Sequence, residues 1–134
     1  MKKILFVLFA LFTFSSLMAK KPGFQLSYGS GGGFTGLSTT YTISSDGTFS
    51  KEDNVSHKKE SLEKVKCKDI KEIRKLIAAV NFSTLNINKT GNITSFVILV
   101  QDGKESKAQW TGSITDNAPL DSLNKKLISL IPHK

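Results

Sequence analysis

The stretch Ser95–Trp110 reads SFVILVQDGKESKAQW, and it decides the fold of this 134-residue chain. Phe96–Val100 in its first half is a continuous apolar run, which is typical of a central strand covered on both faces. The dipeptide Asp102-Gly103 then predicts the two-residue turn of a β-hairpin, and Glu105–Trp110 is the returning strand. The stretch therefore predicts two adjacent antiparallel strands.

A two-residue turn also sets the register of this hairpin. It pairs Leu99 with Ser106 and Val97 with Ala108, and Trp110 follows on the same face. We expect that face to lie against the core. The opposite face sets apolar residues of the first strand against polar and charged residues of the second, namely Phe96, Ile98 and Val100 against Gln109, Lys107 and Glu105. Charge on one side predicts that the second strand lies at an edge of the sheet.

Alternating and β-branched residues predict further strands nearer the N-terminus. Phe24–Tyr28 alternates apolar and polar residues, and Leu37–Ile43 is rich in β-branched and aromatic residues. Asp46-Gly47 predicts a hairpin turn into a strand at Thr48–Lys51. We expect an exposed loop at Lys51–Glu60 and a short further strand at Leu62–Lys66.

Two segments have the 3.6-residue period of amphipathic helices. The first begins at Asp69, which forms a capping-box pattern with Glu72, and its apolar face is Ile70, Ile73, Leu76, Ile77 and Val80. Asn117 and Pro119 predict the start of the second, which stops before Pro132 and whose apolar face is Leu120, Leu123, Leu127, Leu130 and Ile131. The order of these elements predicts an α+β fold, in which a mostly antiparallel sheet of about five strands packs with two amphipathic helices.

Residues 1–19 have the pattern of a secretory signal peptide. Lys2 and Lys3 precede the apolar run Ile4–Phe14, which is too short to span a bilayer, and Ala19 is a suitable cleavage position. We therefore predict that residues 1–19 are a signal peptide and that residues 20–134 are a single domain, exported to the periplasm or secreted. An uncleaved membrane anchor is the alternative reading of the same residues.

The charge of the chain indicates which classes of molecule it is expected to bind. Without Lys2 and Lys3 the chain has 17 basic and 11 acidic residues, and its net charge is +6. Arg74 is the only arginine, whereas recognition of phosphates and bases favours guanidinium groups. We therefore expect a protein partner, no nucleic acid and no stable membrane insertion after signal cleavage. Cys67 is the only cysteine, so the sequence predicts no disulfide framework.

No set of residues in the sequence predicts catalysis. His57 and His133 are the only histidines, and neither has a nucleophile or carboxylate motif beside it. Together with one cysteine they lack the spacing of zinc ligands. Cys67 lies among lysines, which leaves two alternatives: a thiol activated by positive charge or a small buried side chain. We therefore expect a protein that is not an enzyme and that holds neither metal nor cofactor.

The glycine-rich connection between the first two strands is the candidate binding site. Tyr28–Gly36 contains five glycines, a density that costs conformational entropy on folding, and it places Phe34 at the tip of a loop. The stretch fits G-x-G-x-x-G, but a strand follows it rather than the helix that a phosphate site needs. The candidate partner-binding residues are Gly31, Gly32, Gly33, Phe34, Thr35 and Gly36. Phe34 either anchors in an apolar pocket of a partner or folds back as a lid over the sheet.

Four stretches of the chain are similar to parts of one family of small bacterial proteins. Ser30–Gly36 resembles a Ser-Gly-Gly-Phe-Ala-Gly signature after a first strand, with one additional glycine and Thr35 in place of Ala. Ile73–Leu85 resembles a leucine-rich helix with an aromatic exit, Ser95–Trp110 a hairpin with a central Asp-Gly, and Ala118–Leu130 a closing helix. On these residues the chain from Phe24 to Ile131 resembles the emfourin family, which includes an inhibitor of thermolysin-like metalloproteases.

The resemblance implies one function, and the charge pattern leaves another open. The first is an exported binding protein that inhibits a thermolysin-like metalloprotease by plugging its cleft with the glycine-rich loop. The signal peptide departs from the family pattern, because the inhibitor associated with that family works inside the producing cell. The alternative is an envelope interaction module without inhibitory activity, in which the sheet edge or the exposed lysines bind a partner protein or an anionic surface polymer.

Overall fold

The computed structural model describes residues 23–32 and 38–133. It contains one six-stranded sheet with the strand order β4-β3-β2-β1-β5-β6, and every neighbouring pair is antiparallel. The strands are β1 (Phe24–Gly32), β2 (Ser38–Ser44), β3 (Phe49–Asp53), β4 (Lys59–Ser61), β5 (Ile93–Gln101) and β6 (Lys104–Trp110), and the helices are α2 (Cys67–Val80) and α3 (Ala118–Ser129). The predicted α+β fold is confirmed, with one strand more than expected.

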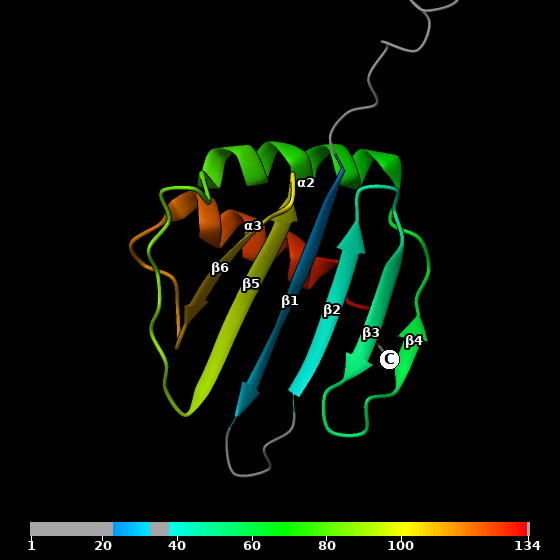
Figure 1. Ribbon diagram of the computed structural model, residues 1–134, viewed down its shortest axis with the longest axis horizontal. Coiled ribbons are helices and arrows are strands. Elements are labelled where there is room, and N and C mark those ends of the chain that lie inside the picture. The colour runs from blue at the N-terminus through cyan, green and yellow to red at the C-terminus, as the bar shows by residue number, and fades with distance from the viewer. Residues whose placement is uncertain (1–22, 33–37, 134) are drawn as a thin grey trace, which may run out of the picture.

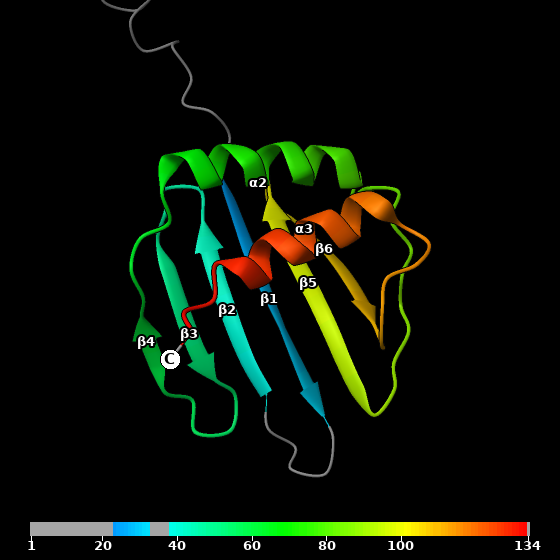
Figure 2. The same ribbon diagram turned by 180° about the vertical axis from the view of Figure 1, so that it is seen from behind.

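Both helices lie on the same face of the sheet. Helix α3 crosses the strands obliquely, whereas α2 runs along the end of the sheet at which β1 begins and β5 ends (Figures 1 and 2). No other described element covers the opposite face, so the domain has two layers. Neither of these helices is both long enough and apolar enough to cross a membrane.

The core lies between the sheet and the two helices. Its fully covered side chains come from four strands and both helices, and they include Leu26, Ile43, Ile73, Val97, Ala108, Leu120, Leu123 and Leu127. Tyr28 joins the layers, because its hydroxyl donates a hydrogen bond of 2.9 Å to the backbone oxygen of Leu127 in α3. Burial, with a smaller contribution from Tyr41, raises the pKa of Tyr28.

The predicted hairpin of β5 and β6 is confirmed in turn, register and position. Leu99 pairs with Ser106 and Val97 with Ala108, and Trp110 is buried on the core face. Asp102 and Gly103 both have positive φ, 53° and 73°, which is the conformation of a type I′ turn. Strand β6 lies at the edge of the sheet, as its charged outer face predicts.

The prediction that Phe96–Val100 is covered on both faces is wrong. Val97 and Leu99 are buried under the helices, but Val100 on the other face is 37% exposed, and Phe96 and Ile98 are half-buried. The apolar run predicts two covered faces because a run without alternation is typical of strands between two helical layers. Here both helices pack on one face, and the other face is left as an open face with an apolar stripe.

The capping-box prediction for α2 is also wrong. The helix begins at Cys67, its N-cap is Lys66, and no side chain accepts a hydrogen bond there. Asp69 therefore lies inside the first turn and binds Lys126 of α3 instead. At α3 the prediction is confirmed, because Asn117 Oδ1 accepts a hydrogen bond of 3.0 Å from the backbone nitrogen of Leu120.

Two further local predictions differ from the structure. The short strand forms at β4, inside the segment predicted as a loop, whereas Leu62–Lys66 is irregular. Strand β4 is only three residues long, and all three are exposed, so it lacks the alternating pattern that identifies a strand in a sequence. Cys67 is exposed at the start of α2, which excludes the buried side chain and leaves the thiol at the surface.

Both edges of the sheet leave few backbone groups free to pair with another strand. On one side the edge is the three-residue β4. On the other side the segment before β5 bonds to the end of β6, with Lys89 donating to the backbone oxygen of Gln109 at 3.0 Å and Gln109 donating to Ile87 at 3.1 Å. On the β6 side these contacts leave only the first part of the strand as a free edge, and on the other side the free edge is limited to the three residues of β4.

Candidate functional site

The glycine-rich connection leaves the sheet at the end opposite α2, which we call the loop end. It consists of Ser30–Gly32 of β1, Ser38–Thr39 of β2, Asp53–Val55 at the end of β3, and Asn92-Ile93 at the start of β5. Strand pairing and one backbone hydrogen bond, from Asn54 to Ser38, bring these four segments together. Figure 1 shows the ends of β1 and β3 and the starts of β2 and β5 at this side of the sheet.

The structure places the first two predicted site residues inside β1. Gly31 pairs with Ser38 of β2 and also with Thr94 of β5, and Gly32 pairs with Ile93. Gly32 has a φ of 107°, which lies in the region that favours glycine. The other predicted site residues, Gly33, Phe34, Thr35 and Gly36, lie outside the described residues. The base of the connection is therefore a paired strand in the middle of the sheet.

Gly29 allows β1 and β2 to approach closely. A Cβ atom at this position would clash with the backbone oxygen of Thr39 in β2. On the open face the ring of Phe96 lies next to Gly29, its pairing partner in β5. An aromatic ring beside a strand glycine covers the backbone that the missing side chain leaves exposed. This contact explains why Phe96 is half-buried on a face without a helix.

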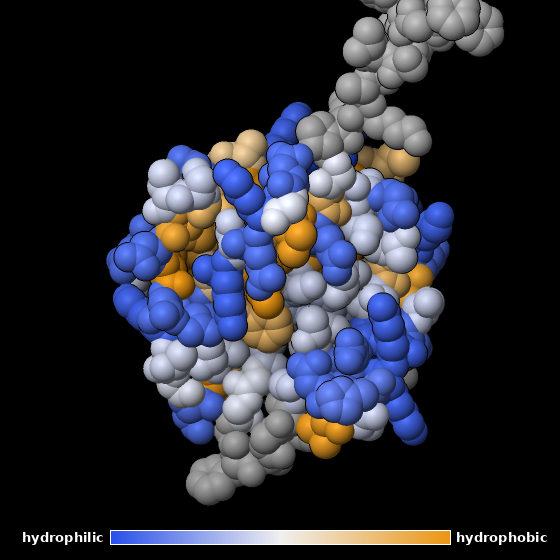
Figure 3. All heavy atoms as spheres, viewed as in Figure 1, coloured by the Kyte–Doolittle hydropathy of each residue, from blue (hydrophilic) through white to orange (hydrophobic). Residues whose placement is uncertain are grey.

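Exposed aliphatic side chains surround the loop end, and we call Val55, Ile93 and Ile128 the apolar rim. The side chain of Val55, beside β2, is 59% exposed. Ile93, which is the pairing partner of Gly32, is 57% exposed, and Ile128 of α3 is 49% exposed. Among the described residues only one other large hydrophobic side chain is exposed, Val100 on the open face. In Figure 3 hydrophobic atoms reach the surface at this end of the molecule. These side chains come from different sides of the loop end, and exposed apolar groups at one end of a fold are candidate contact points for a partner.

Short-range hydrogen bonds hold the segment that carries Val55. Asp53 Oδ1 accepts hydrogen bonds from the backbone nitrogens of Val55 and Ser56, at 2.8 and 3.3 Å, and these donors lower the pKa of the Asp53 carboxyl. The Asn54 amide donates to the hydroxyls of Ser38 and Thr40, at 2.8 and 2.9 Å. Val55 is therefore presented by a backbone that is tied to β2.

A cavity of about 270 Å³ lies beside the loop end, between the sheet and α3. Ser30 and Thr39 line it from the strands, and Asn124 and Ile128 line it from the helix. The stacked rings of Tyr28 and Tyr41, with centroids 5.6 Å apart, form another part of its wall. Pockets for small molecules are typically about 300–1,000 Å³, so this cavity is small for a ligand and better suited to one side chain of a partner.

The residues with reactive side chains are not brought together. His57 Nδ1 lies 3.8 Å from Glu52, and both side chains are solvent-exposed. Cys67 is at the far end of the sheet, at the start of α2. Within residues 23–32 and 38–133, no group of three or more His, Cys, Asp or Glu side chains has the geometry of a metal site. Trp110 is buried in the core, as the register of the hairpin predicts.

A comparison with protein-family models and with curated protein sequences finds no match to this chain. The function proposed below therefore rests on the geometry of the loop end. The sequence reading missed the apolar rim, because Val55, Ile93 and Ile128 come from separate parts of the chain. Each is an isolated aliphatic residue in a polar segment or on a helix, and only the placement of β1 between β2 and β5 brings them to one end.

Proposed function

We propose that the protein is an exported binding protein whose loop end docks onto a protein partner, and that this partner is a thermolysin-like metalloprotease. The observation that carries the proposal is the apolar rim, which surrounds the base of the glycine-rich connection. Specific protein interfaces have apolar centres with polar borders. Ser30, Thr39 and Asn54 supply polar groups around the rim.

The arrangement of the loop end favours inhibition over a flexible encounter. Gly31 is paired on both sides, so the connection to Ser38 starts and ends on the two central strands of the sheet. A rigid base lowers the conformational entropy that the connection loses when it enters a cleft. Phe34 would then fill the apolar specificity pocket of the enzyme, and the rim would contact the borders of the cleft.

The experiment measures inhibition of a thermolysin-like metalloprotease by residues 20–134 and by three variants. Phe34→Ala removes the proposed anchor, and Val55→Ser removes one member of the apolar rim. Val100→Ser is the matched control, because Val100 is also exposed but lies on the open face, outside the loop end. We expect Phe34→Ala to abolish inhibition, Val55→Ser to weaken it about 10-fold or more, and the control to leave it unchanged.

Measurements of thermal stability distinguish the two roles considered for Phe34, an anchor in the partner and a lid over the sheet. If Phe34 is an anchor, Phe34→Ala leaves the thermal midpoint nearly unchanged while inhibition is lost. A large fall in the midpoint identifies Phe34 as a lid over the fold, and unchanged inhibition by Phe34→Ala contradicts the anchor directly. If the unaltered protein binds an envelope protein but does not slow the protease, the alternative function of an envelope interaction module replaces the inhibitor.

A further inference from the structure

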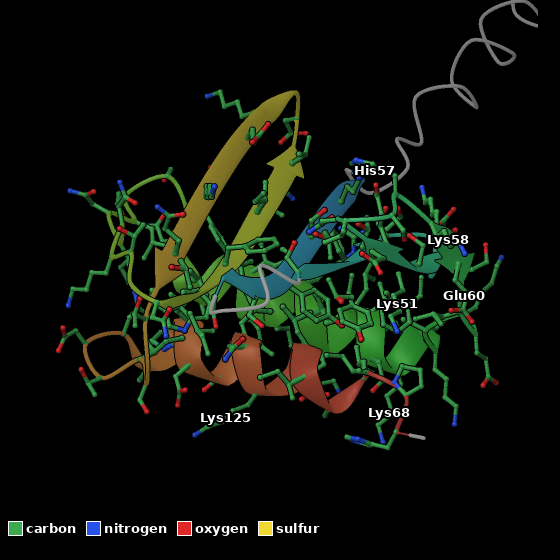
Figure 4. All side chains as sticks on the ribbon, turned by 90° about the horizontal axis from the view of Figure 1, so that it is seen from below. Lys51, His57, Lys58, Glu60, Lys68 and Lys125 are labelled. Carbon is green, nitrogen blue, oxygen red and sulfur yellow. The ribbon has the colours of Figure 1, made fainter. Side chains whose placement is uncertain are left out.

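The outward side of α2 carries a row of lysines, and we call Lys68, Lys71 and Lys75 the lysine row. Their spacing of three and four residues places them on one side of the helix, directly opposite the buried stripe formed by Ile70, Ile73 and Ile77. All three are exposed, and with Glu72 they line a shallow depression of the surface. In Figure 4 Lys68 points away from the sheet on the helical side of the molecule.

The positive charge of this row is not cancelled by the acidic residues of its own helix. Lys126 of α3 binds both of them, with its Nζ atom 2.7 Å from Asp69 Oδ1 and 2.9 Å from Glu72 Oε2. None of the three lysines forms an ion pair with any residue of the described ranges. The outer side of α2 is therefore a local excess of positive charge.

The N-terminal segment joins the fold beside this helix. The guanidinium carbon of Arg74 in α2 lies 5.1 Å from the ring centroid of Phe24, the first residue of β1. The residues before Gly23 include Lys2, Lys3 and the apolar run Ile4–Phe14, which are the features that predict contact with a membrane. Before its predicted cleavage, or as the membrane anchor of the alternative reading, this segment is linked to the domain through the start of β1, which lies against α2.

We propose that the lysine row is a docking surface for an anionic lipid bilayer. Helix α2 lies along the outer end of the sheet, so a flat surface can reach it without meeting the loop end (Figures 1 and 2). Strand β1 has nine residues and spans about 30 Å between these two ends. A protein that rests on a bilayer through α2 presents its loop end to the surrounding solution.

The experiment measures binding of residues 20–134 to vesicles by co-sedimentation, and all described core residues fall inside that range. The vesicles contain either phosphatidylcholine alone or phosphatidylcholine mixed with phosphatidylglycerol. Lys68→Gln/Lys71→Gln/Lys75→Gln removes the row. Lys58→Gln/Lys89→Gln/Lys107→Gln is the matched control, because it removes the same charge from exposed lysines on other parts of the surface. Thermal melting of all three proteins verifies that they fold alike.

We expect binding to the anionic vesicles only, and weaker binding as the salt concentration rises. A lysine near an anionic surface is worth about a fivefold change in binding, so removal of the row lowers binding on the order of 100-fold, whereas the control lowers it far less. Equal losses in the two triple variants would show that net charge alone drives binding and would overturn the proposal. Binding to soluble polyphosphate but not to vesicles would overturn it as well. Protease inhibition by the row variant stays intact, which keeps this test independent of the loop end.

Discussion

At the scale of single residues, Gly29 has the clearest structural requirement in the sheet. It lies between Thr40 and Phe96, its two pairing partners, in the strand that leads to the loop end. The backbone oxygen of Thr39 occupies the space that a Cβ atom would need. Backbone atoms cannot rotate away as a flexible side chain can, so any larger residue must separate β1 from β2.

We predict that Gly29→Ala destabilises the protein by more than about 2 kcal/mol, because overpacking against a fixed backbone forces the strands to shift. Urea unfolding followed by tryptophan fluorescence of Trp110 measures this loss. Gly23→Ala is the control, because the nearest contact of its added Cβ atom is the hydroxyl of Ser45 at 3.3 Å. Equal stability of the two variants would contradict the close approach of β1 and β2.

At the scale of elements, Lys126 links the two helices. Its side chain is only 19% exposed, and it reaches two acidic residues of α2. The neighbouring Lys125 pairs with Asp121 inside α3 at 2.8 Å, but its side chain is 74% exposed. A partly covered ion pair between elements is expected to contribute more than an exposed pair within one helix, which is screened by water.

We predict that Lys126→Gln costs about 1–2 kcal/mol of stability, because it leaves Asp69 and Glu72 without their shared partner. Lys125→Gln, the adjacent substitution on the same helix, costs less than about 0.5 kcal/mol. Chemical denaturation at neutral pH compares the two. A larger loss for Lys125→Gln would show that the contact between the helices does not stabilise the fold.

The contacts of α3 with β1 and with α2 predict a loss of stability at alkaline pH. Burial raises the pKa of Tyr28 above its unfolded value, and hydrogen bonds to Asp69 and Glu72 raise that of Lys126. A raised pKa in the folded state stabilises the protein below the unfolded pKa, and the stabilisation is lost as the pH rises further. We therefore expect the free energy of unfolding to fall above about pH 10.

Tyr28→Phe tests this expectation. The variant loses one hydrogen bond, about 1 kcal/mol at neutral pH, while the Leu127 oxygen keeps the backbone nitrogen of Leu130 as a donor at 3.2 Å. Its stability then falls less steeply than that of the unaltered protein between about pH 9 and 11.5. Tyr41→Phe, whose hydroxyl has no hydrogen-bond partner among the described residues, serves as the control and keeps the steep fall.

At the scale of the whole molecule, the sheet has one covered face and one open face. Val97 and Val100 lie in the same strand and are the same residue type, but Val97 is fully buried and Val100 is 37% exposed. We predict that Val97→Ala costs about 2 kcal/mol and Val100→Ala less than about 1 kcal/mol. Thermal unfolding of both variants measures the difference. Equal losses would indicate that another surface covers the open face in solution.

Local sequence signals predicted those parts of the fold that depend on a few neighbouring residues. The Asp102-Gly103 turn allows one register, so the whole hairpin followed from it. Asn117 is bonded to Leu120 within its own helix, and that cap was predicted too. Asp69 was misread because its partner, Lys126, is 57 residues away and the contact requires both helices to be in place.

The loop end could not be predicted without knowing the order of the strands in the sheet. Val55 and Ile93 belong to segments that do not pair with each other, and no period or motif in the sequence links them. They flank the same connection because β1 pairs with β2 on one side and with β5 on the other. That order results from packing of the whole sheet on α2 and α3, which a reading of local patterns does not contain.

The restricted edges of the sheet have a consequence for behaviour in concentrated solution. Fibrils with a cross-β structure grow when new strands bond to an open edge. One edge here ends in the exposed residues Lys59–Ser61, and the other is partly occupied by its bonds to Ile87 and Lys89. The folded protein therefore offers a poor template for fibril growth, although six of its eight described elements are strands.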